Sequence, residues 1–266
     1  MNKKIRLIQN FFLVAAPILA SSAFGISPSK AATFAISNSQ VEFENFSQIS
    51  SDFVSFTDTD TLTDSKNGSV RAIANANVDF LEAPAFATNT NLSLAFGENQ
   101  DYLGLADSQS EIIGNFDIQA DTNFSFNFSA FLNLETSIDN PPAENARASG
   151  DISFLLFDLE NNNILDFFSL TGNLTTEGEN DFIGLQTSER VNISQAVADT
   201  NFGGNEESLV AFIRGKYERN FANETNLALI EFKRNRVRVT APEPSISLAL
   251  LVSSGVIGVV LKRRRK

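Results

Sequence analysis

The clearest pattern in the chain is a sustained alternation of apolar and polar residues between Thr122 and Leu134. Successive side chains of a β-strand point to opposite faces, so a period of two predicts a strand with one buried face. The odd positions are polar apart from Phe131. The even positions from 124 onward are apolar: Phe124, Phe126, Phe128, Ala130, Leu132 and Leu134. We expect this stretch to be a central strand with its phenylalanines in the core.

Shorter alternating segments recur along the middle of the chain, separated by clusters of Asn, Asp, Gly and Pro. They are residues 41–46, 70–81, 91–96, 112–118, 152–159, 164–170, 209–213, 226–232 and 236–239. About a dozen short strands with turn signals between them predict an all-β fold, and we expect a β-sandwich of jelly-roll type. A β-solenoid is the alternative, although the sequence shows no fixed repeat period.

Two local expectations follow from the same patterns. Residues 194–198 are the stretch with apolar residues at helical spacing, which predicts one or two helical turns. The segments 209–213 and 226–232 follow each other closely, so we expect them to pair as a late hairpin.

Residues 241–266 differ in character from the rest of the chain. After Pro242, Glu243 and Pro244, residues 245–261 carry no charge. A helix of that length rises roughly 26 Å, close to the hydrocarbon thickness of a bilayer, so a transmembrane helix is expected. The prolines predict an extended break before it. Five basic residues end the segment: Lys262, Arg263, Arg264, Arg265 and Lys266. Such residues stay cytoplasmic, which places the preceding domain outside.

In this order of features, residues 241–266 resemble the PEP-CTERM sorting signal of exported bacterial proteins. The resemblance rests on the Pro-Glu-Pro tripeptide, the short apolar helix and the basic end. It implies processing by a membrane-embedded exosortase, and members of this family are typically linked to extracellular polysaccharide and biofilm matrix. An ordinary single-pass anchor is the alternative, and it also places the domain outside the cytoplasm.

The N-terminal segment has the pattern of a secretory signal peptide. Lys3, Lys4 and Arg6 precede an apolar run that reaches Ala20. Small residues in the sequence Ser-Lys-Ala at 29–31 favour cleavage after residue 31 or 32, with residues 21–23 as the earlier alternative. The sequence therefore predicts a signal peptide at 1–31, an extracytoplasmic domain at 32–240 and a sorting or anchor segment at 241–266.

The middle segment is strongly acidic. All 32 acidic residues and 11 of the 20 basic residues lie between residues 32 and 244, which gives this segment a net charge of −21. This argues against nucleic acid and anionic membrane surfaces as partners. The chain has no Cys, but about 210 residues can bury a full core without disulfides.

The residue types that are missing limit the chemistry of the chain. Without His or Cys, the usual triads, thiol nucleophiles and imidazole-bound zinc sites are unavailable. A glycosidase needs only two facing carboxylates, but no pair stands out. Sugar binding on aromatic platforms is disfavoured because there are 25 Phe, no Trp, and only Tyr102 and Tyr217. A sugar site lined by Asn and Asp, or bridged by Ca²⁺, remains compatible with the composition.

One polar stretch is a candidate calcium site. Asp58, Asp60 and Asp64 lie close together in what the sequence suggests is a loop. Ca²⁺ takes oxygen ligands of this kind, but the spacing matches no EF-hand, and a solvated acidic loop is the alternative. No other cofactor is expected.

The basic run at 233–238 has a structural interpretation. We expect its cations to point outward from the last strand and to discourage edge-to-edge pairing. Docking to an anionic polymer is the alternative role.

Together these patterns predict an exported, acidic, all-β protein of the cell surface or extracellular matrix. We expect it to be anchored in the membrane in transit, processed by an exosortase-type enzyme and free of enzymatic activity. The alternatives are a carbohydrate-binding module that acts on exopolysaccharide and a glycoside-active enzyme.

Overall fold

The computed structural model describes residues 32–241, except residues 83, 84, 177 and 179. Regular structure in that part of the chain consists of ten strands, each antiparallel to its neighbours. They are β1 (Ala32–Glu44), β2 (Asp52–Glu82), β3 (Ala85–Ile118), β4 (Thr122–Ile138), β5 (Asn145–Asp158), β6 (Asn163–Thr175), β7 (Phe182–Thr187), β8 (Val191–Asn201), β9 (Glu206–Phe221) and β10 (Thr225–Ala241). The all-β prediction is confirmed.

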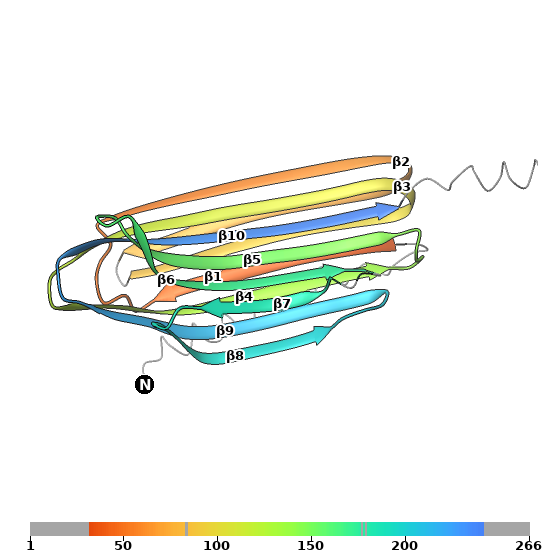
Figure 1. The fold of residues 1–266 in the computed structure, drawn as a ribbon. Coiled ribbons are helices and arrows are strands. Elements are labelled where there is room, and N and C mark those ends of the chain that lie inside the picture. The colour runs from red at the N-terminus through yellow and green to blue at the C-terminus, as the bar shows by residue number, and fades with distance from the viewer. Residues whose placement is uncertain (1–31, 83–84, 177, 179, 242–266) are drawn as a thin grey trace, which may run out of the picture. The chain divides into compact units, whose positions relative to one another are not determined.

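The strands form one nearly closed, barrel-like sheet. Its order is β7-β6-β5-β10-β3-β1-β4-β9-β8, and β2 pairs along β3. Figure 1 shows the long strands running side by side, with β2 at one margin of the view and β8 at the other.

The two longest strands, β2 and β3, form a hairpin that folds back on itself. A single register joins them from Asp52 opposite Asn115 to Glu82 opposite Ala85. The first limb of β3, up to residue 98, pairs with β1, and the second limb, residues 102–118, pairs with β10. Side chains of the two limbs meet across the interior, as the 2.9 Å contact between the hydroxyls of Ser93 and Ser108 shows. The hairpin therefore carries the sheet from one side of the interior to the other.

Tyr102 occupies the corner at which β3 doubles back. Asn99 and Asp101 take φ values of 70° and 61°, in the left-handed region that Asn and Asp enter more readily than other side chains. The buried ring of Tyr102 lies against Gly97, where an added Cβ would be 2.1 Å from Cε2. The Tyr102 hydroxyl donates a hydrogen bond to Thr33 on β1. Only glycine at position 97 leaves room for this ring.

The alternating stretch is strand β4, between β1 and β9, as the sequence predicts. Phe124, Phe126 and Phe128 are buried, whereas Phe131 faces the opposite side and is half-buried. The ring centroid of Phe126 lies 5.3–5.9 Å from those of five other aromatic rings: Phe43, Phe46, Phe124, Phe154 and Tyr217. β4 therefore supplies the centre of an aromatic cluster.

A second region of the interior, between β1, β3 and β10, is polar. Its side chains point inward and are buried, although alternation alone does not predict polar residues there. They are Ser37, Ser39, Asn89, Asn91, Ser93, Ser108, Ser110, Glu231, Lys233 and Asn235. We call these ten residues the polar interior.

Three local expectations are wrong. Residues 194–198 are not helical, because they lie in β8, which pairs with β9. Strands β9 and β10 do not pair with each other, since β9 lies between β4 and β8 while β10 returns to the middle of the sheet, between β5 and β3. The basic run is consequently not on an edge strand. Lys233 is fully buried in the interior, and Arg234 and Arg236 lie on the outer face, in contact with Asp107.

We expect Phe126→Ala to lower the free energy of unfolding by about 3–5 kcal/mol, because it removes the ring at the centre of the aromatic cluster. Phe131→Ala, on the other face of β4, is the matched control and should cost less than half as much. Urea denaturation followed by circular dichroism measures both. Equal losses for the two variants would contradict the assignment of faces.

Candidate functional site

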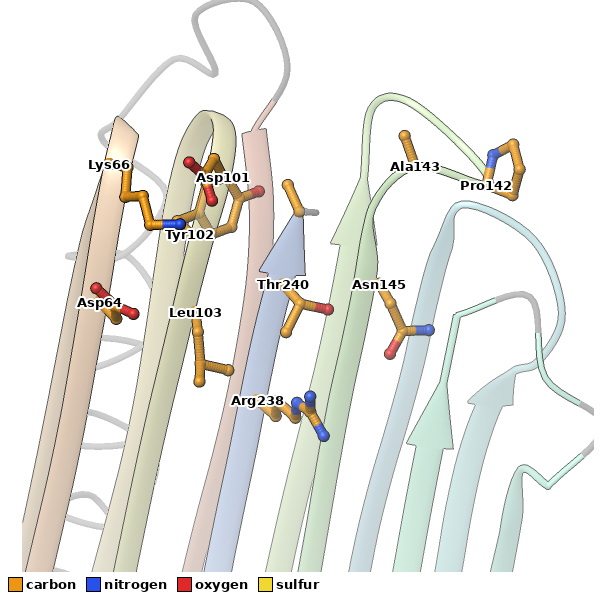
Figure 2. Close-up of a pocket in the computed structure, with 11 residues that line it drawn as sticks. Asp64, Lys66, Asp101, Tyr102, Leu103, Pro142, Ala143, Asn145, Arg238 and Thr240 are labelled. Carbon is orange, nitrogen blue, oxygen red and sulfur yellow. The ribbon is translucent and has the colours of Figure 1, made fainter. Parts of the chain in front are cut away.

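A hollow of about 480 Å³ lies where the bend of the β2–β3 hairpin meets the start of β5 and the end of β10. Its polar lining residues are Asp64, Lys66, Asp101, Asn145, Arg238 and Thr240, and Tyr102, Leu103, Pro142, Ala143 and Ala241 complete the wall. Figure 2 shows that these side chains come from neighbouring strands and the turn before β5, and that the Lys66 amine is directed toward the bend that holds Asp101 and Tyr102. The site therefore depends on the corner of the folded hairpin.

Both charges and neutral hydrogen-bonding groups line the hollow. Asp101 accepts a hydrogen bond from the Asn67 amide at 3.3 Å. Asn145 donates to the Thr176 carbonyl at 3.2 Å and accepts from Arg147 Nε at 3.2 Å. Because donors and acceptors alternate over a small area, the hollow suits a neutral ligand with many hydroxyl groups better than a strongly charged one.

Tyr102 belongs to the wall of the hollow and offers no aromatic platform. Its side chain is 5% exposed. Burial raises the pKa of its phenol to about 12, while the hydrogen bond to Thr33 opposes that rise. The hydroxyl therefore stays protonated at neutral pH and holds β3 to β1.

A cluster of charges lies beside the hollow on the outer face of β10. Arg234 Nε and Arg236 Nη2 each lie 3.0 Å from a carboxylate oxygen of Asp107 on β3. Burial opposes ionisation of Asp107, but the hydrogen bonds from both arginines outweigh it and hold its pKa below the usual range. Two of the three arginines in the run thus share one carboxylate partner, Asp107, while Arg238 lines the hollow.

The candidate calcium ligands lie on strand β2 rather than in the expected loop. Asp58, Asp60 and Asp64 share one face of the strand, opposite Gln109, Asp107 and Leu103 of β3. In the described ranges, no three acidic side chains are arranged to hold a metal ion. The structure brings only Asp64 to the hollow.

Sequence reasoning missed a pair of carboxyl groups formed by Asp181 and Glu207. Glu207 is buried, accepts from the Thr136 hydroxyl at 3.0 Å and from the Gly203 amide at 3.2 Å, and shares a hydrogen bond with Asp181. Retaining glycosidases hold their two carboxyl groups about 5–5.5 Å apart, and inverting ones hold them farther apart. Because the two carboxyl groups are in hydrogen-bond contact, their spacing fits neither arrangement. No sequence signal joins two residues 26 positions apart, one just before β7 and the other at the start of β9.

The sorting motif Pro242, Glu243 and Pro244, and the basic residues from Lys262 to Lys266, lie outside the described residues. The expected apolar helix at 245–261 lies outside them as well. Within residues 32–241, apart from the four omitted positions, no helix is long and apolar enough to cross a membrane.

Comparison of the chain with protein-family models, with curated proteins and with solved structures gives no match in any of the three. The geometry and the sequence patterns are therefore the basis for assigning a function.

We expect Glu207→Gln to flatten part of the pH dependence of stability. Burial first, and then the Asp181 carboxyl, raise the pKa of Glu207 above its ordinary value of 4.5. The native state therefore keeps a proton that the unfolded chain releases, and stability falls as pH rises above 4.5 toward the native pKa. A glutamine mimics the protonated acid, so the variant should lose less stability over that window.

Urea denaturation at a series of values from about pH 4 to about pH 8 measures this slope. Glu206→Gln, at the exposed neighbouring position, is the control. A Glu207→Gln variant with the wild-type slope would contradict the raised pKa of Glu207.

Proposed function

We propose that this chain is an exported, non-enzymatic protein of the cell surface or extracellular matrix, sorted through its C-terminal segment by an exosortase-type enzyme. The observation that carries the proposal is the position of the motif. Strand β10 ends at Ala241, and Pro242, Glu243 and Pro244 follow directly. A processing enzyme needs an extended segment that is not paired in a sheet. The motif begins at the residue directly after the last paired residue of β10.

The same proposal includes the surroundings in which the protein acts. The apolar helix holds the chain in the membrane in transit, and the acidic β domain then belongs to the surface or to an exopolysaccharide matrix. We also assign the fold to the jelly-roll-like β-sandwiches. The supporting feature is the folded β2–β3 hairpin, whose limbs lie in opposite walls and meet through inward side chains such as Phe53 and Phe80, with ring centroids 3.9 Å apart.

Intact-mass measurement on protein recovered from cells and from the medium tests the sorting proposal. We expect the recovered form to end near Pro244, with or without an added group. Replacing Pro242 and Pro244 with alanine should leave residues 245–266 attached, because the extended break is lost. A wild-type protein that retains residues 245–266 in both fractions would show an ordinary anchor instead.

A second candidate function, carbohydrate binding, is favoured by the hollow itself. Sugar recognition without aromatic stacking needs a concave surface with several hydrogen-bonding groups, and the hollow offers Asn145, Thr240 and Arg238 beside two carboxylates. This fits the exopolysaccharide setting of the main proposal.

We expect soluble neutral polysaccharide to retard the protein in affinity electrophoresis, and Arg238→Ala to weaken that binding by about tenfold, which corresponds to about 1.4 kcal/mol. Arg214→Ala is the matched control, because Arg214 does not line the hollow. Absence of retardation, or an equal loss in the two variants, would reject the hollow as the binding site.

A further inference from the structure

The polar interior contains a lysine, an asparagine and a glutamate from opposite walls of the sheet. Lys233 and Glu231 belong to β10, and Asn89 belongs to the first limb of β3, which does not pair with β10. All three are buried, with 0% exposure. Burial of an amine and a carboxyl group without solvent is costly, so this arrangement needs a specific physical reason.

Hydrogen bonds hold the Asn89 side-chain amide at both ends. Its Nδ2 donates to Glu231 Oε2 at 2.6 Å. Its Oδ1 lies 2.6 Å from the Ser110 hydroxyl, whose single proton is shared between this oxygen and Asn91 Oδ1 at 2.7 Å. The hydroxyl draws electron density from the carbonyl, and the carboxyl group lies against the nitrogen. The amide is therefore polarised and has an acid at its nitrogen atom.

Lys233 reaches the same asparagine from the opposite wall. Its Nζ donates to the main-chain carbonyl of Asn89 and, at 3.2 Å, to that of Ser39. The ion pairs found among the described residues do not include Lys233 with Glu231. The amine therefore contacts neutral carbonyls, and no carboxylate in direct contact stabilises its charge.

The protonation states follow from this environment. Burial lowers the pKa of Lys233 to about 7, although the charge of Glu231 opposes the shift. Burial likewise raises the pKa of Glu231 to about 7, against the influence of Lys233 and Asn89. A neutral amine is a nucleophile and a protonated carboxyl group is an acid, so both groups are available in the forms that acyl transfer needs.

We propose that Lys233 and Asn89 react with each other to form an intramolecular amide cross-link between the two walls of the sheet, with Glu231 as the acid and base. Lys233 Nζ attacks Asn89 Cγ, and a new C–N bond forms. The bond from Cγ to Nδ2 breaks and ammonia leaves. The amine loses one proton and the leaving nitrogen gains one, so no oxidant, reductant or cofactor is needed.

Glu231 carries the proton in this scheme. The carboxyl group touches the leaving nitrogen through Oε2, whereas its other oxygen, Oε1, is buried and has no hydrogen-bond partner. Oε2 passes a proton to Nδ2 as the bond from Cγ breaks, and the carboxylate left on Glu231 then recovers the proton that Nζ releases as the lysine closes on Cγ, so the acid is regenerated. The unpartnered oxygen is otherwise an unexplained cost within the polar interior.

Peptide mass spectrometry of the full chain tests this directly. Trypsin cannot cut after a cross-linked Lys233, so residues 220–234 should remain joined to residues 72–147, which contain Asn89. The joined species should be lighter than the sum of its two parts by about 17 Da, the mass of the ammonia released by acyl transfer. This measurement does not depend on the fate of the C-terminal segment, so it can fail while the sorting proposal stands.

Variants assign the three roles. Lys233→Arg and Glu231→Gln should give separate peptides at full mass. Asn89→Asp should still cross-link but lose water, about 18 Da, because a carboxylic acid then replaces the amide. Asn91→Ala, which keeps the three reacting groups, is the matched control and should retain the cross-link.

The wild-type result decides the proposal even if a variant fails to fold. Recovery of residues 220–233 as a free peptide cut after Lys233 would overturn it and would leave the polar interior as a purely noncovalent network. A cross-link to Asn91 or Asn235 in place of Asn89 would overturn the assignment of the acyl donor.

Discussion

The doubling back of the β2–β3 hairpin is the constraint on which the rest of the domain depends. β1, β4, β9 and β8 follow in order from the first limb of β3, and β10, β5, β6 and β7 follow from the second. Each wall is therefore built outward from one limb of a single strand. A few residues at the corner allow β3 to bend in this way. Tyr102 packs over Gly97, and Asn99 and Asp101 adopt positive φ. A bulkier residue at 97 would displace the ring that fixes where the two walls separate.

The interior enclosed by these walls has two kinds of contact. Around β4 and β9, aromatic rings pack edge-to-face or stacked, and apolar burial stabilises the fold without requiring one particular partner. Between β1, β3 and β10, stabilisation comes from directed hydrogen bonds. Among buried side-chain polar atoms of the described residues, only Glu144 Oε1 and Glu231 Oε1 lack a partner. A slip of one residue in β10 would expose its buried charges and break the hydrogen bonds from Asn89 to Glu231 and from Asn91 to the Lys233 carbonyl, so this region specifies the register.

Sequence alternation predicted the strand most dependent on burial and missed the features that depend on long-range pairing. Phe124, Phe126 and Phe128 of β4 lie on the face that parity assigns to the core, and Phe131 lies on the other. Parity is also correct for Lys233, which shares a face with Val237 and Val239, but a lysine was expected to face solvent. Nothing local reveals that β10 lies in the middle of the sheet, because β10 meets β3 across more than a hundred residues of sequence.

The candidate site was predictable to a similar extent. The Asn-rich and Asp-rich turns mark where strands end, and the hollow lies beside one of them, the turn before β5. The three aspartates of β2 suggest a loop because Thr and Asp dominate residues 58–64, where Leu62 is the single large apolar residue. Strand β2 is an exposed edge strand that pairs with β3 alone. A polar composition suits such a strand, because neither of its faces is buried along these residues. Asp181, held by the Thr175 amide at the end of β6, meets Glu207 at the start of β9 through the closure of the sheet, which is not a property of either segment.

The position of β10 determines the order in which the domain can be completed. It is last in sequence, yet it is the strand that joins β5 to β3. A chain that emerges N-terminus first therefore holds β5, β6 and β7 apart from the second limb of β3 until residue 241 is free. Every pairing of β10 closes a long loop, so its insertion is the slow, non-local step of assembly. Until then the inward faces of β3 and β5 stay open, and the segment after Ala241 emerges only as the interior becomes able to close.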